Sequence, residues 1–115
     1  MFVSHVDEIP SLPVESESVK NVLKQVLVGP EQGWEGYVMR LFTVKGQGNS
    51  PRHAHPWPHI NYIVAGEGIL YLDGKEHTLK AGGVAFIPPD REHQFINRTD
   101  GDFSFICIVP EEGDK

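Results

Sequence analysis

The chain has 115 residues, and its 39% hydrophobic and 23% charged content is typical of a globular protein rather than a disordered one. A net charge of −6 argues against sequence-independent nucleic-acid binding, and no apolar run reaches the roughly 20 residues of a membrane helix. The only cysteine, Cys107, has no partner for a disulfide within the chain. We therefore expect a single domain over residues 1–115, without a signal peptide, in the cytoplasm.

The first part of the chain predicts an arm followed by an ambiguous segment. Residues 1–18 are mostly polar and contain Pro10 and Pro13, which predicts an extended arm. In residues 19–28 the apolar positions fit both a helical stripe and one face of a strand. The strand signals in the rest of the chain favour a strand here.

A series of strand signals then occupies the rest of the chain. The expected strands are 36–44, 60–65, 69–72, 75–79, 84–87, 92–96 and 103–109. The glycine-rich stretch 46–51 is expected to end the first of them. Asp73-Gly74 predicts a type I′ hairpin, because both positions of that turn need a positive φ. With no convincing helix, the pattern predicts an all-β sandwich or small barrel, and the acidic tail 111–115 is expected to fray.

Three of the six histidines lie within residues 52–59. On a strand His53 and His55 would point to the same face with their Cα atoms roughly 6.5–7 Å apart, so both could reach one ion. The prolines that follow force a turn, and His59 opens the next strand, where a third ligand can converge. The clustering therefore predicts a metal site. His5 and His77 are expected to be ordinary surface residues.

Two spaced motifs around these histidines resemble those of the cupin family. The first cupin motif is Gly, His-x-His, three or four residues, Glu, six residues and Gly; here it runs from Gly48 to Gly66, with four residues rather than the usual five before the first histidine. The second is Gly, five residues, Pro-x-Gly, two residues, His, three residues and Asn; here it runs from Gly82 to Asn97. The resemblance spans about residues 36–110 and implies a single-domain jelly-roll barrel with a metal inside one end.

Two positions depart from the family pattern. Asp90 stands at the glycine position of the second motif, and aspartate tolerates turn conformations. His59 stands at the glutamate position of the first motif. The resemblance then implies four metal ligands, namely His53, His55, His59 and His93, as in the four-histidine manganese cupins among the small single-domain cupins. Those proteins are dimeric and have been linked to the oxidative cleavage of alkenes with peroxide.

Replacing a carboxylate by an imidazole removes one negative charge from the ligand set and leaves the metal a stronger Lewis acid. Ligand softness alone favours zinc, copper, iron or nickel over manganese, which prefers oxygen donors. The resemblance instead implies one divalent metal per chain, with manganese first and iron second, while zinc or nickel remain alternatives. Zinc with four histidines would form a closed structural site, whereas ligands held on one side of a metal leave two positions open.

Five further residues are candidates for lining a substrate pocket, namely Arg40, Trp57, Phe95, Phe105 and Cys107. Phe95 shares a strand face with His93, and the resemblance turns the face of Phe105 and Cys107 toward the metal. Each candidate also has a structural interpretation. The phenylalanines would fill a core, Cys107 would be a small buried hydrophobe, Trp57 a turn residue, and Arg40 an edge-strand residue facing water.

Three functions remain open from the sequence. The apparent lack of an acid–base pair favours a manganese- or iron-dependent oxidoreductase that uses dioxygen or peroxide on a small, partly apolar substrate. A Lewis-acid enzyme such as a sugar isomerase would need a carboxylate or lysine near the metal. A non-catalytic metal- or ligand-binding module is compatible with the same fold. Finally, residues 60–65 are apolar on both faces, which predicts a homodimer, with the N-terminal arm or its copy from a partner chain as the available cover.

Overall fold

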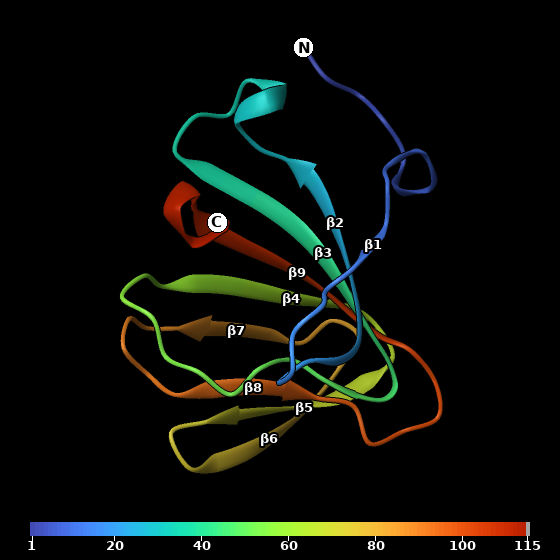
Figure 1. The fold of residues 1–115 in the computed structure, drawn as a ribbon, viewed down its shortest axis with the longest axis vertical. Coiled ribbons are helices and arrows are strands. Elements are labelled where there is room, and N and C mark those ends of the chain that lie inside the picture. The colour runs from blue at the N-terminus through green and yellow to red at the C-terminus, as the bar shows by residue number, and fades with distance from the viewer. Residues whose placement is uncertain (115) are drawn as a thin grey trace.

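The computed structural model describes residues 1–114, and its regular secondary structure is mainly antiparallel strands (Figure 1). The strands are β1 (Leu12–Pro13), β2 (Lys20–Val28), β3 (Tyr37–Asn49), β4 (His59–Ala65), β5 (Glu67–Leu72), β6 (Lys75–Lys80), β7 (Val84–Ile87), β8 (His93–Ile96) and β9 (Phe103–Pro110). Three short 3-10 helices are η1 (Val6–Glu8), η2 (Pro30–Gln32) and η3 (Glu111–Asp114). The all-β prediction is confirmed. Within residues 1–114 no helix has the length and apolar character needed to cross a bilayer.

The strands form one sheet that folds over on itself into a nearly closed jelly-roll barrel (Figure 1). One layer has the order β1-β2-β3-β9-β4-β7, and the other has the order β8-β5-β6. The two layers join where Asn49, at the end of β3, pairs with Ile96 of β8. In the β5–β6 hairpin, Asp73 and Gly74 have φ values of 47° and 85°, which confirms the type I′ turn.

The ambiguous segment 19–28 forms strand β2, as the all-β context favoured. It pairs along most of its length with β3 and turns Val22, which is only 5% exposed, into the core. The prediction that β3 ends at the glycine-rich stretch is wrong, because the strand continues to Asn49. Gln47 has a φ of 63°, and the register with β2 slips at this point. Such a bulge bends a strand, and it carries β3 around the corner of the barrel to β8.

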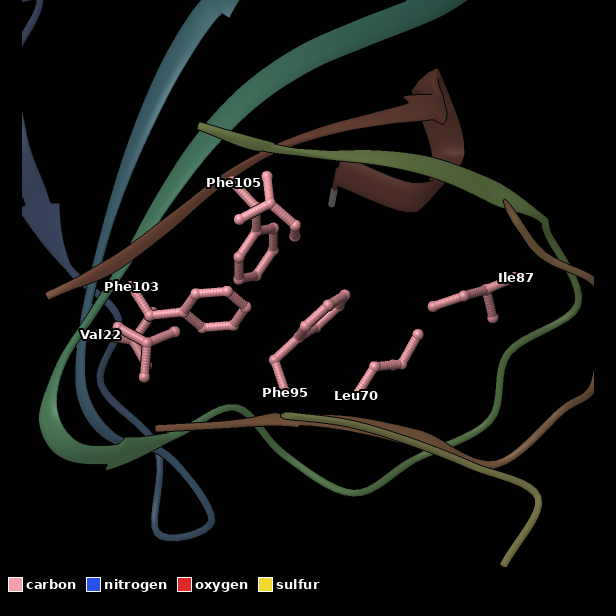
Figure 2. Packing of buried hydrophobic residues seen from close by; sticks show 8 residues of the cluster. Val22, Leu70, Ile87, Phe95, Phe103 and Phe105 are labelled. Atoms are coloured by element: carbon pink, nitrogen blue, oxygen red, sulfur yellow. The ribbon is translucent and has the colours of Figure 1, made fainter. Parts of the chain in front are cut away.

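The hydrophobic core lies between the two layers (Figure 2). Its buried members are Val22, Val44, Ile63, Leu70, Ile87, Phe95, Phe103 and Phe105. The rings of Phe95 and Phe105 stack with centroids 4.1 Å apart. Alternate residues of β9 point inward, which follows from the two-residue repeat of a strand. The core fills one part of the barrel interior and leaves the histidine-bearing part to the site.

The N-terminal arm has the extended structure that was predicted, whereas the C-terminal tail does not fray as predicted. The arm is mostly exposed and extended, as predicted, and β1 pairs Leu12 with Lys24 of β2. The prediction of a frayed tail is wrong for residues 111–114, which form η3. There Asp114 is half-buried, and its carboxylate forms an ion pair with Lys24 at 2.7 Å. Lys115 lies outside the described residues.

Candidate metal centre

The two histidine motifs meet through a backbone pair between His53 and His93. The amide of His53 donates to the carbonyl oxygen of His93 at 3.1 Å, and the reverse bond measures 2.9 Å. This pair is an isolated antiparallel bridge, so the expectation of a strand through His53 and His55 is wrong. The prolines on both sides lack the N–H that would extend the ladder. The bridge brings His93 next to the first histidine pair, a contact that sequence spacing alone could not establish.

The four predicted histidines form one cluster. Ligand nitrogens of His53, His55 and His93 all lie within 4.8 Å of one another, a spacing that can hold a metal ion. His59, at the start of β4, joins them because its Nε2 lies 3.2 Å from Nε2 of His93. His59 and His93 are buried, whereas His53 and His55 lie nearer to solvent. His5 and His77 are exposed and lie apart from the cluster.

Hydrogen bonds select the same tautomer for three of these imidazoles. Nδ1 of His55 donates to the carbonyl oxygen of Trp57 at 2.9 Å, and Nδ1 of His93 donates to that of Arg91 at 2.7 Å. Nδ1 of His59 donates to the side-chain oxygen of Asn61 at 2.7 Å. An amide oxygen only accepts, so the proton of each neutral ring lies on Nδ1 and the Nε2 lone pair is free. Three Nε2 lone pairs available for coordination fit a metal site.

The electrostatic environment keeps the buried histidines neutral. The pKa of His59 is lowered to about 3, mainly by burial and further by the nearby His93, His55 and Arg40, while the hydrogen bond that Nδ1 donates to Asn61 opposes this change. Burial also lowers the pKa of His93. Imidazole must be neutral to bind a metal, so the site is ready for a cation at neutral pH without first losing protons.

The second motif contains a sharp turn at Asp90, the residue that replaces the glycine of the family pattern. Asp90 has a φ of 62°, in the left-handed region where glycine is favoured and aspartate is tolerated. Its amide donates to the carbonyl oxygen of His55 at 2.8 Å. The turn before β8 is thereby tied to the loop that carries the first histidine pair, and the substitution leaves the junction of the two motifs intact.

A cavity of about 460 Å³ opens beside the cluster. All four histidines line it, and so do the five predicted pocket residues, Arg40, Trp57, Phe95, Phe105 and Cys107. Arg40 is 9% exposed, which contradicts the interpretation as an edge residue facing water. Phe95 and Phe105 serve both the core and the cavity wall. Trp57 stacks on His55 with ring centroids 4.8 Å apart at the accessible side of the cluster.

Cys107 is a neutral thiol beside the histidines. Its Sγ accepts a hydrogen bond from Nη2 of Arg40 at 3.0 Å and lies 3.5 Å from Nδ1 of His59. Burial raises the pKa of this thiol, and the charge of Arg40 offsets the effect only in part. A buried neutral thiol is a poor nucleophile, which agrees with the interpretation of Cys107 as a small buried side chain.

Sequence reasoning missed three residues at the site. Asn61, which orients His59, lies two positions after it on β4, so the strand repeat alone could have placed it on the same face. Lys24 lines the cavity and pairs with Asp114 at its edge. These two come from opposite ends of the chain, and no local pattern connects them. A lysine and a carboxylate therefore lie at the edge of the cavity, although sequence reasoning could place neither near the metal.

Comparisons with known proteins identify a family and several relatives. The cupin domain family matches residues 40–109. An oxalate-binding protein of Thermotoga maritima is 34% identical over 50 residues, 44% of this chain and 41% of that protein. A dimethylsulfoniopropionate lyase of Ruegeria pomeroyi is 35% identical over 57 residues, 49% of this chain and 38% of that protein. These alignments therefore span less than half the length of either curated relative.

A solved structure extends the likeness to nearly the whole chain. The polyketide cyclase RemF from Streptomyces resistomycificus superposes with a TM-score of 0.90 at 25% identity, over 96% of this chain and 79% of that one. The names of these three relatives describe an oxalate-binding protein, a lyase and a cyclase. The fold does not choose among these activities, and the chemistry has to be argued from the site.

Proposed function

Because the chain belongs to the cupin family, we propose that its histidine cluster binds one divalent metal per chain and that the protein is a metal-dependent oxidoreductase. The observation that carries the proposal is the convergence of neutral imidazoles, held with Nε2 free, on one end of a largely apolar cavity. A small, partly apolar substrate would bind there, with dioxygen or peroxide as the oxidant. His53, His55, His59 and His93 are the proposed ligands.

Manganese is the first proposed metal and iron the second, and either would supply the redox chemistry when bound. The chain's own residues orient the imidazole ligands and shape the substrate cavity. The carbonyl groups behind His55 and His93 and the amide of Asn61 hold the imidazole rings in place. Phe95 and Phe105 offer an apolar wall that keeps water from the buried side of the cavity. The buried neutral thiol of Cys107 supplies no base.

The experiment is a turnover assay with an alkyl hydroperoxide and an electron-rich alkene. Protein loaded with manganese or iron should oxidise the alkene, with isotope from labelled oxidant appearing in the product by chromatography and mass spectrometry. Metal-free protein and a His55→Ala variant should be inactive, whereas a His77→Ala variant, changed at an exposed histidine, should match wild type. Equal yields from all four proteins would show that the chemistry does not belong to this site.

A second candidate is a non-catalytic module that binds a small ligand. The Thermotoga relative, named for binding oxalate, favours it. Inertness toward peroxide with every metal tried, together with tight binding of a ligand that is recovered unchanged, would favour this function over the oxidoreductase.

We also propose that the chain forms a homodimer through an apolar patch on β4 and β7. The patch comprises the exposed side chains of Ile60, Tyr62, Val64, Val84 and Phe86. Cross-strand pairing sets Ile60 beside Phe86 and Tyr62 beside Val84, so the patch is continuous. The arm of the same chain pairs with β2 instead and leaves the patch exposed (Figure 1). An exposed apolar patch on two paired strands favours a second copy of the chain as its cover.

A further inference from the structure

Two cations and one carboxylate meet at the edge of the cavity. Nζ of Lys24 lies 2.7 Å from Oδ1 of Asp114, and Nη1 of Arg40 lies 3.4 Å from the same oxygen. Lys24 and Arg40 both line the cavity, and their side chains are mostly buried. Two positive charges therefore lie at the edge of a pocket whose other walls are formed by the four histidines and by apolar side chains such as Phe95 and Phe105.

Arg40 is incompletely satisfied in this arrangement. Nη2 donates to a sulfur atom, which is a weak acceptor, and Nη1 makes one long contact with Asp114. Nε is buried and has no hydrogen-bond partner within residues 1–114. A guanidinium group prefers two parallel hydrogen bonds to one carboxylate, and leaving a buried donor unpaired costs about 1–3 kcal/mol. A carboxylate in a better position could therefore accept hydrogen bonds from the unpaired N–H groups of Arg40.

Asp114 reaches the cations from η3, a single turn of four residues. The turn packs close to Trp57, because a Cβ added at Gly113 would lie 2.6 Å from Nε1 of that ring. Its two glutamates are exposed, so few side chains hold it in place. The carboxylate of Asp114 thus occupies the cationic end of the cavity from a small element beside the histidine cluster.

We propose that Lys24 and Arg40 form a carboxylate-binding subsite of the cavity, and that Asp114 occupies it until a carboxylate ligand displaces it. The contact chain from Arg40 through Cys107 to His59 measures 3.0 Å and 3.5 Å, so the subsite is one side chain away from the proposed metal ligands. The ligand class is a small, partly apolar carboxylate, whose charged end meets the cations and whose apolar part faces Phe95 and Phe105. The inference rests on the proposed function only in taking this cavity as the substrate site.

The test measures binding rather than turnover, so its failure is distinct from failure of the proposed oxidation. Benzoate is titrated calorimetrically into wild-type protein and into Asp114→Asn, Lys24→Gln and Glu112→Gln variants, each with and without bound metal. Benzamide, a neutral ligand of the same shape, is titrated in parallel. Glu112→Gln is the matched control, because it removes a carboxylate from the same turn at an exposed position.

Asp114→Asn should bind benzoate about tenfold or more tightly than wild type, since the internal competitor is gone and a charge-assisted bond is available. Lys24→Gln should bind it at least several-fold more weakly, and Glu112→Gln should match wild type. Benzamide affinity should not change among the variants. Equal benzoate affinity in wild type and Asp114→Asn would overturn the proposal. An equal gain for benzamide would also overturn it, because the substitution would then only have widened the cavity.

Discussion

The Nε2 atoms of His59 and His93 lie 3.2 Å apart in the buried part of the site. Nδ1 of each ring donates a hydrogen bond to an oxygen atom, so the Nε2 atoms of both rings carry lone pairs. Two lone pairs at this distance repel each other unless a proton or a cation lies between them. Burial opposes protonation by lowering both pKa values. The metal ion that we propose would relieve this repulsion at neutral pH.

Asn61 should act as a positioning residue for His59. An Asn61→Ala variant loses the acceptor for Nδ1, so the ring can rotate or change tautomer, and metal affinity should fall about 10–100-fold. Asn61→Asp keeps an oxygen in place and should restore most of the affinity. Competition with a chelator of known strength measures both values. A similar loss in both variants would mean that Asn61 only fills space.

The metal-free protein should lose stability in acid through His59. Its pKa is about 3 when folded, against 6.5 for an ordinary histidine, so below pH 6.5 the unfolded chain takes up a proton that the folded chain excludes. The free energy of unfolding should be independent of this group above pH 6.5. It should then fall by up to about 1.4 kcal/mol per pH unit from this group down to pH 3. Urea unfolding across this range should show a shallower slope for His59→Gln, and identical slopes would contradict the assignment.

The proposed dimer should depend on the apolar patch on β4 and β7. Wild-type protein should sediment as a dimer of the 12.9 kDa chain at micromolar concentration. Tyr62→Glu or Phe86→Glu places a charge in the patch and should give monomers, because an unpaired buried charge is costly. Val26→Glu changes an exposed valine of β2 outside the patch and should leave the dimer intact. A monomeric wild type would remove the proposal.

Gly68 is required by the core. A Cβ at this position would lie 2.3 Å from the ring of Phe103, which is fully buried. Gly68→Ala should therefore lower the free energy of unfolding by about 1–3 kcal/mol in urea titrations. Gly101→Ala is the control, since nothing lies within 4 Å of its added Cβ, and its effect should be smaller. Equal effects at the two glycines would contradict the packing argument.

Local sequence patterns predicted most of the strands because each side-chain repeat and turn signal acts over a few residues. Asp73-Gly74 and the alternation in β9 are examples. The course of β3 past Gln47 could not be predicted in this way, because a bulge is stabilised by pairing with strands distant in sequence. The prolines around His53 and His55 did argue locally against a regular strand, because proline has no N–H to donate to a ladder.

The site shows the same division. The histidine spacing and the family resemblance named the four candidate ligands, but the His53–His93 bridge that joins them is a long-range contact. The position of Asn61 on the same strand face as His59 could have been predicted from the two-residue repeat of a strand. The Lys24–Asp114 pair could not have been, because it depends on how a tail turn packs across the barrel end. Such pairings depend on the tertiary structure, so the sequence of either segment alone does not predict them.

Elemental analysis of protein purified without added metal tests the central claim most directly. Wild-type protein should contain one manganese or iron ion per chain. His93→Ala should lose it, because a buried ligand is removed, while His77→Ala should retain it at the exposed control position. Full metal occupancy in His93→Ala at neutral pH would contradict the assignment of the site.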